Sequence, residues 1–189
     1  SLNLNPQDVK EELRLDRIDN TVRLCVVLND FIEQEGNVLV LCGGRGTTLK
    51  LASYTKMYFE EKGMLPDMSC DEEIQRAIEI VKLENGENDP LIKCLKFGIC
   101  YHNSGLSSLV KETIEELVRN NKIKLIFATT TLAQGMKFPI NTVIFDTVKL
   151  RNKGDLSNAE FWNIAGRAGR AYKDKEGYII LSYSNSQKE

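Results

Sequence analysis

The chain has 189 residues, of which 42% are hydrophobic and 28% are charged, a balance that suits one soluble domain with a sizeable core. Its formal net charge of -2 disfavours a domain that is basic over a whole face, so any contact with nucleic acid would use a local patch or backbone amides. No run of eighteen apolar residues occurs, so no membrane contact is expected. The five cysteines are scattered without a C-x-x-C pair, and there is one histidine; these counts indicate a reducing intracellular compartment (cytoplasmic or nuclear) and no metal site.

Helices and short apolar strands alternate along the chain. The pattern predicts strands over 37–42, 97–102, 124–129, 142–148 and 177–183. It predicts helices over 17–35, 47–63, 70–84 and 107–122, a short helix from 89 that leads into the second strand, and a helix through 161–170. Residues 151–158 are predicted to form a polar loop. This order is typical of an α/β fold with a mostly parallel central sheet of about five to six strands and helices on both faces. We expect residues 1–16 to be an N-terminal lead-in from a longer protein and residues 17–189 to form one domain.

The turns after the predicted strands are the candidate sites, because ligands of such sheets bind beyond the carboxyl ends of the strands. The turn GGRGTT at 43–48 does not match G-x-x-x-x-G-K-[ST] in any register, so it predicts a tight turn whose amides or Arg45 could meet an anion rather than a complete phosphate-binding loop. After the strand 124–129, Thr129 and Thr130 offer hydroxyls and amides that suit a phosphate backbone. A helix cap followed by a turn is an equally good interpretation of these threonines.

The segment FWNIAGRAGR at 161–170 reads as a helix although it contains two glycines, each of which costs a helix interior roughly 1 kcal/mol relative to alanine. On a helical wheel Asn163, Arg167 and Arg170 lie together, opposite a stripe that includes Ile164. Two arginines one turn apart suit a multi-oxygen anion such as a nucleotide triphosphate tail. The alternative is a solvated charged face, which would gain nothing from the glycines.

Four segments resemble motifs of superfamily 2 helicases, in the order and spacing of that family. NIAGRAGR resembles the Q-x-x-G-R-x-G-R sequence of motif VI, and ATTTLAQGMKFP resembles motif V in the form of the Ski-two-like branch. YHNSGLSSLVKETIEELVRNNKIKLIFAT is similar to the H-H-A-G-L segment of that branch with its following helix and strand, and VLVLCGGRGTTLKLA resembles motif IV. Together they cover roughly residues 37 to 183. The chain thus resembles the second RecA-like domain, the C-terminal helicase domain, of a DEAD/DEAH-box-type helicase.

The resemblance implies a role for each matching residue. Arg167 and Arg170 would be arginine fingers that reach the phosphates of ATP bound by another domain. The residues implied near the nucleotide are Asn163, Gly135, Lys137 and Gly166, and those implied to contact nucleic acid are Thr129, Thr130, Arg45, His102 and Gly105. For His102 the alternative is a strand-end residue that is hydrogen-bonded locally. The chain departs from the family pattern at Asn163 (usually glutamine), Lys137 (often asparagine or aspartate) and Asn103 (often a second histidine).

The sequence contains no G-x-x-x-x-G-K-[ST] and no D-E-x-[DH], so we do not expect this chain alone to hydrolyse ATP. The resemblance implies that ATP with Mg²⁺ is held mainly by an N-terminal RecA-like domain of the same protein, absent here, and that the isolated chain holds no cofactor. A start at Ser1 looks like a piece cut from that longer protein. The other expected partner is single-stranded nucleic acid, RNA or DNA. Two alternatives stay open: a non-catalytic interaction module with the helicase fold, and a translocase on double-stranded DNA.

Overall fold

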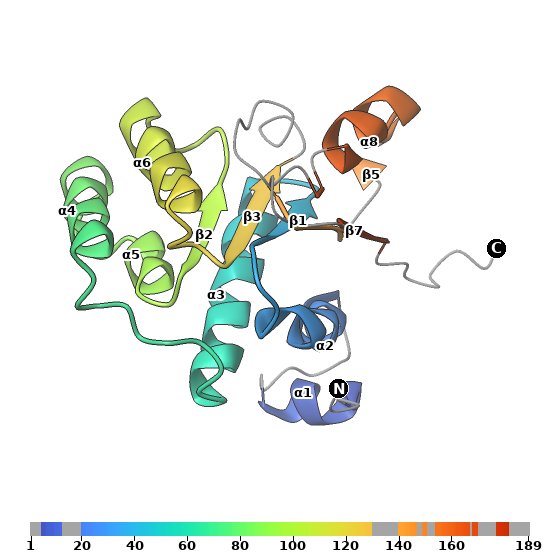
Figure 1. Cartoon of the computed structure of the whole chain (residues 1–189), viewed down its shortest axis with the longest axis horizontal. Coiled ribbons are helices and arrows are strands. Elements are labelled where there is room, and N and C mark those ends of the chain that lie inside the picture. The colour runs from blue at the N-terminus through green and yellow to red at the C-terminus, as the bar shows by residue number, and fades with distance from the viewer. Residues whose placement is uncertain are drawn as a thin grey trace.

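A parallel sheet forms the centre of the molecule (Figure 1). The computed structural model describes residues 5–12, 20–129, 140–146, 149–150, 154–166, 168–169 and 177–181. The strands of the sheet are β1 (Val38–Cys42), β2 (Ile99–His102), β3 (Leu125–Thr129), β4 (Thr142–Phe145) and β7 (Tyr178–Leu181). They are arranged in the order β2-β3-β1-β4-β7, and every neighbouring pair is parallel. This confirms the predicted α/β fold with a parallel sheet.

Helices connect the strands and cover the sheet. They are α1 (Pro6–Glu12), α2 (Asn20–Ile32), α3 (Arg45–Glu61), α4 (Glu72–Asn85), α5 (Pro90–Leu95), α6 (Ser108–Arg119) and α8 (Asn158–Ala165). The connection from β1 to β2 contains α3 and crosses the sheet beyond β3 to the edge position of β2. The connection from β2 to β3 contains α6 and runs across the sheet in the opposite direction. Right-handed crossovers that run in opposite directions place their helices on opposite faces. We therefore assign α3 and α6 to opposite faces, with α4 packed beside α6 (Figure 1).

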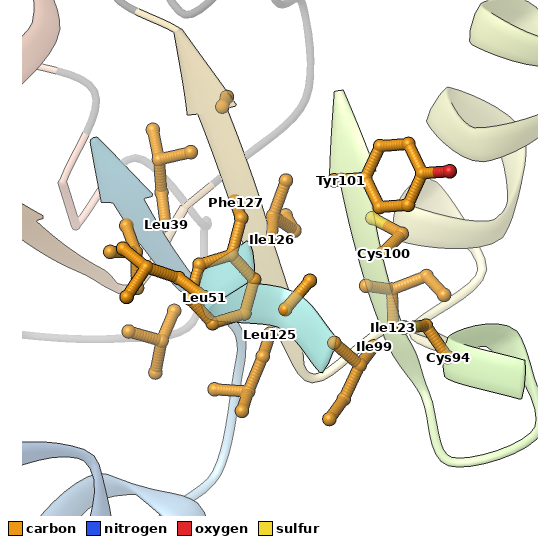
Figure 2. Close-up of a cluster of buried hydrophobic side chains, with 14 of the residues drawn as sticks. Leu39, Leu51, Cys94, Ile99, Cys100, Tyr101, Ile123, Leu125, Ile126 and Phe127 are labelled. Atoms are coloured by element: carbon orange, nitrogen blue, oxygen red, sulfur yellow. The ribbon is translucent and has the colours of Figure 1, made fainter. Parts of the chain in front are cut away.

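The core lies between β1, β2, β3 and the helices that pack on them. Figure 2 shows Leu39, Phe127 and Leu51, from β1, β3 and α3, among the buried side chains of this region. Strands covered on both faces require continuous apolar sequence, which explains why their bounds fall within two residues of the predicted ones. Four of the five cysteines belong to the buried core, among them Cys94 and Cys100. Burial raises the pKa of the Cys94 thiol to about 12 and that of Cys100 far above its usual range, so both behave as small hydrophobic side chains.

The edge strand β7 differs from the other strands. Its residues Tyr178, Ile179 and Leu181 are 47%, 42% and 56% exposed, whereas every residue of β1 is buried. Among the described residues β7 pairs with β4 alone. The apolar sequence therefore predicted the strand but not its position at the edge of the sheet.

Two segments differ from their predicted structure. The expected loop 151–158 contains the strand β6 (Gly154–Asp155), which pairs with β5 (Lys149–Leu150) in a short antiparallel ribbon. The expected helix through 161–170 is wrong in its second half, because α8 ends at Ala165.

Beyond α8 the chain takes a different backbone conformation. Gly166 is the C-cap of the helix, Ala168 forms a parallel bridge with Ile140, and the Gly169 amide donates to the Ile140 carbonyl at 2.9 Å. Gly169 has a φ of +74°, in the left-handed region that glycine adopts at little cost. The predicted helix therefore does not continue through Gly166 and Gly169; Arg167 and Arg170 lie outside the described residues.

At the N-terminus α1 packs against α2, and Val9 of α1 is fully buried. This contact attaches part of the expected lead-in to the helical layer. The boundary between residues 16 and 17 lies outside the described residues and stays a prediction. None of the helices in the described part of the chain has the length and hydropathy needed to cross a membrane.

Candidate functional site

The carboxyl ends of the central strands bring three predicted segments to one edge of the sheet. Parallel register places Cys42 at the end of β1 beside Thr129 at the end of β3, and His102 at the end of β2 beside Ala128. The turn after β1, the loop after β2 and Thr129 therefore lie at the same edge, which Figure 1 shows at the arrowheads of β1, β2 and β3. This is the edge where ligands of parallel sheets bind.

Arg45 lies in the turn after β1. Helix α3 begins at Arg45, two residues before its predicted start. Its N-cap is Gly44, which has an extended backbone and no side chain to accept a hydrogen bond; the Thr47 and Thr48 amides both donate to the Gly44 carbonyl at 3.1 Å. The exposed Arg45 side chain thus starts from the positive end of a helix dipole. An anion is the ligand that this combination favours.

A buried asparagine joins this turn to the loop after β2. Asn103, 6% exposed, donates from Nδ2 to Thr48 Oγ1 at 3.0 Å and accepts from the Gly105 amide at Oδ1 at 2.9 Å. The Thr48 hydroxyl in turn donates to the Arg45 carbonyl at 2.7 Å. Sequence reasoning noted Asn103 only as a departure from the family and missed this role. The signal present in the sequence is an asparagine two residues before a glycine, a pattern typical of an Asx turn.

Gly105 lies against the Arg45 side chain. A Cβ atom placed on Gly105 would be 3.4 Å from Arg45 Nη1, 3.6 Å from Arg45 Cδ and 3.0 Å from Asn103 Oδ1. The tightest of these approaches is to Asn103, whereas the distances to Arg45 are ordinary van der Waals distances. The structure therefore places these two predicted nucleic-acid residues close together.

His102 is buried at the end of β2 rather than presented to a ligand. Its side chain is 3% exposed, and neither ring nitrogen has a hydrogen-bond partner among the described residues. Its Nε2 lies 3.5 Å from Glu115 Oε1. Burial, and secondarily the charge of Lys111, lower the pKa of His102 to about 4, so the ring is neutral near pH 7. Within the described part of the chain the ring is therefore buried and makes no hydrogen bond of the kind that was its alternative.

The start of α8 is fixed by a capping box. Ser157 Oγ accepts from the Glu160 amide at 3.2 Å, and Glu160 Oε2 accepts from the Ser157 amide at 3.1 Å. The S-x-x-E pattern that is typical of such a cap is present in the sequence, but sequence reasoning placed Ser157 in the loop 151–158 and did not use the pattern.

Aromatic packing attaches α8 to the sheet. Phe161 stacks on Phe145 at the end of β4, with ring centroids 4.8 Å apart. Ile164 is buried in the same helix, while the neighbouring Asn163 is exposed, as predicted for this half of the segment. Gly166, at the C-cap, is also exposed. These contacts fix where the segment after α8 leaves the helix.

The segment after α8 meets the chain at the start of β4. The bridge between Ala168 and Ile140 joins residues of the predicted motif VI to the residue directly after the predicted motif V. The predicted site residues Arg167, Arg170, Thr130, Gly135 and Lys137 lie outside the described residues.

One further polar residue at this edge was missed from the sequence. Asp146 follows β4, is 6% exposed, and donates its amide to the Leu41 carbonyl at 3.1 Å. Burial and then the charge of Asp146 raise the pKa of Cys42. Within the described part of the chain no group of three or more His, Cys, Asp or Glu side chains is arranged to hold a metal ion.

Known proteins similar to this chain are helicases and a Hachiman protein. Residues 62–172, more than half of the chain, match the family described as helicase conserved C-terminal domain. The chain is 36% identical over 155 residues to Hachiman protein HamB of Bacillus cereus, 37% over 119 residues to antiviral helicase SKI2 of Saccharomyces cerevisiae, and 36% over 133 residues to exosome RNA helicase MTR4 of Homo sapiens. These matches cover 82%, 60% and 67% of this chain but 14%, 9% and 13% of the relatives.

The chain thus spans less than a sixth of the length of these curated relatives. The matched region contains β2, β3, β4 and α8, so it includes the loop after β2 and the segment after α8 as well as most of the sheet. The chain belongs to the helicase C-terminal domain family, within superfamily 2 and with relatives in its Ski-two-like branch.

Proposed function

We propose that this chain is the second motor domain of an ATP-dependent helicase that moves along single-stranded nucleic acid. The observation that carries the proposal is the family match of residues 62–172 on a sheet whose carboxyl edge gathers Arg45, Gly105 and Thr129. In this proposal one part of the domain binds the phosphates of the strand, and the segment after α8 meets a nucleotide held by another domain.

The nucleic-acid track would use groups that contact phosphates. Arg45 supplies a charge, Gly105 allows close approach of the strand, and Thr129 and Thr130 supply hydroxyls and amides. Such contacts position a strand without reading its bases. We assign no direct contact to His102, because its ring is buried. The name of the relative MTR4 specifies RNA, which makes RNA the first substrate to test.

On the nucleotide side, Arg167 and Arg170 would act as arginine fingers. Groups of this kind stabilise the charge that develops on the transferred phosphoryl group and are worth roughly 10³ to 10⁵ in turnover. The bridge between Ala168 and Ile140 supports the proposal, because Ala168 stands between the two arginines in the sequence and Ile140 follows Lys137 by three residues. Asn163 and Gly166 are exposed near the same segment and would line the nucleotide.

ATP and Mg²⁺ would be held mainly by an N-terminal RecA-like domain of the same protein. In support, the sequence lacks a phosphate-binding loop and the chain spans a small part of its relatives. This chain alone would then be inactive. All five cysteines are free thiols, which supports an intracellular, reducing compartment, cytoplasmic or nuclear.

The test is ATP hydrolysis by the full-length gene product, measured without nucleic acid and with single-stranded RNA, single-stranded DNA or duplex DNA. We expect single strands to stimulate turnover and a tailed duplex to be separated, while the 189-residue chain alone shows no turnover. Absence of turnover in the full-length protein would favour a non-catalytic module. Stimulation by duplex DNA without strand separation would favour a translocase.

A further inference from the structure

One buried side chain connects two segments of the proposed nucleic-acid track. Asn103 lies 55 residues after Thr48, its hydrogen-bond partner in the first turn of α3. We propose that Asn103 is a positioning residue that fixes the place of the Arg45 guanidinium, through Thr48 on one side and Gly105 on the other. The inference rests on the proposed function, in which Arg45 contacts a phosphate.

The first connection reaches the backbone of Arg45. Asn103 Nδ2 donates to Thr48 Oγ1 at 3.0 Å, and the proton of that hydroxyl goes to the Arg45 carbonyl at 2.7 Å. Thr48 is fully buried and Asn103 is 6% exposed. Water therefore cannot readily replace either partner, and the two hydrogen bonds hold the turn in one position relative to β2.

The second connection reaches the side chain of Arg45. Asn103 Oδ1 accepts from the Gly105 amide at 2.9 Å and so holds the loop in a tight turn beneath the arginine. A Cβ on Gly105 would be 3.4 Å from Arg45 Nη1, so the guanidinium lies close to this turn. The same asparagine thus fixes both the backbone that carries Arg45 and the surface under its side chain.

The start of α3 has no side-chain cap among the described residues that could take over this task. The N-cap of α3 is Gly44, whose missing side chain makes no capping hydrogen bond. Arg45 is the first residue of the helix and is exposed, so its side chain would sample many rotamers if the loop beneath it moved. Ordering such a side chain on binding costs free energy, and a preformed contact surface reduces that cost.

The experiment measures binding of the full-length protein to a single-stranded RNA oligonucleotide over a range of salt concentrations. Each phosphate contact to a single strand contributes about 0.7 to the slope of log Kd against log salt concentration. We expect Arg45→Ala to lower the slope by about 0.7. Asn103→Ala should lower it by the same amount and add nothing when combined with Arg45→Ala. A loss of stability alone reduces the folded fraction but leaves this slope unchanged.

Thr48 provides a matched pair of variants for the case in which Asn103→Ala does not fold. Thr48→Ser keeps the hydroxyl and should keep the slope, whereas Thr48→Val removes it and should lower the slope as Arg45→Ala does. Arg76→Ala is the control, because Arg76 lies on α4 in an exposed pair with Glu72 and should not change the slope.

The outcomes separate this inference from the proposed function. If Asn103→Ala and Thr48→Val keep the wild-type slope while Arg45→Ala lowers it, the positioning role is wrong and the proposed function stands. A further drop in the double variant would show that Asn103 makes its own contact and would also overturn the inference, as would an unchanged slope in Arg45→Ala. If the wild-type protein does not bind single strands at all, the proposed function itself fails.

Discussion

Helix α3 carries Arg45, and helix α8 precedes Arg167 and Arg170 in the sequence. These are the arginines proposed to bind phosphates, and the first turns of the two helices are stabilised differently. The start of α8 is held locally, by the reciprocal hydrogen bonds of Ser157 and Glu160. The start of α3 has no side-chain cap and is held instead by Asn103, 55 residues away along the chain. The start of α8 is therefore specified by a few neighbouring residues, whereas that of α3 depends on the completed sheet.

Helix α3 differs from α4, α5, α6 and α8 in having no side-chain cap at its N-terminus. Helices α4, α5 and α6 are capped by side chains like α8, through Asp71, Asp89 and Ser107. At α3 a glycine occupies the cap, so the first turn beside Arg45 has no side-chain capping hydrogen bond. A local cap would stabilise the helix by about 1 kcal/mol but would occupy the space that the proposed phosphate needs.

Removing the aromatic contact under α8 should have the largest effect. Phe145 is 1% exposed and stacks on Phe161, so Phe145→Ala should lower the free energy of unfolding of the 189-residue chain by about 3–5 kcal/mol. The measurement is chemical denaturation, with Leu83→Ala as the control because Leu83 is 85% exposed. A loss below about 1 kcal/mol would show that tertiary packing contributes little to the position of α8 and that its local cap suffices.

Acid should weaken the β2 region through His102. The pKa of this histidine is about 4 in the folded chain against an ordinary 6.5, because of burial and then Lys111. The unfolded chain therefore takes up the proton first, and stability falls as the pH decreases from about 6.5 to about 4, by at most about 3 kcal/mol.

The matched variant for this prediction is His102→Leu, since His102 is the one histidine of the chain. Carboxylates such as Asp71, whose pKa is lowered by its hydrogen bond with Lys122, lose their contribution equally in both proteins. The difference between the two stability curves should therefore be constant above pH 7 and shift in favour of His102→Leu in acid. Parallel curves between pH 7 and 4 would show that His102 is not held in its neutral form.

The long-range connection at α3 can be tested by stability as well as by binding. Thr48→Val leaves the buried Asn103 amide without its acceptor and should cost about 1–3 kcal/mol, whereas Thr48→Ser should cost clearly less. Hydrogen exchange should show faster opening both at the start of α3 and in the loop after β2. Faster exchange at α3 alone would mean that the two segments are not coupled.

Removing the local cap of α8 should have the smallest effect. Ser157→Ala deletes the hydroxyl that accepts from the Glu160 amide and should cost about 1 kcal/mol. Because the capping box is local, exchange should increase in the first turn of α8 and stay unchanged in α3 and β2. Faster exchange in β2 or α3 as well would contradict the claim that the start of α8 is stabilised locally.

The sequence predicted the elements well where local pattern decides them. The strands β1 and β3 lie within one residue of the expected ranges 37–42 and 124–129, because continuous apolar runs between turn residues have one favourable interpretation. The end of α8 was missed for the converse reason. A helical wheel extends a pattern through Gly166 and Gly169, while the chain leaves the helix to pair with Ile140, a contact that no local pattern displays.

The site shows the same division. The resemblance to helicases singled out Arg45 and Gly105, which the structure places close together. The function of Asn103 could not be read from its neighbours alone, since one of its partners belongs to another helix. The burial of His102 likewise depends on packing at the end of β2, near Glu115 of α6.

The most direct test of the proposed function compares turnover with nucleotide binding in the full-length protein with saturating single-stranded RNA. We predict that Arg167→Ala and Arg170→Ala each lower ATP turnover by about 10³-fold or more and change the Kd for nucleotide by much less. The control Arg76→Ala replaces an exposed arginine on α4 and should change neither quantity. Unchanged turnover in both arginine variants, or an equal loss of turnover and nucleotide affinity, would contradict the claim that this domain lends arginines to a nucleotide bound elsewhere.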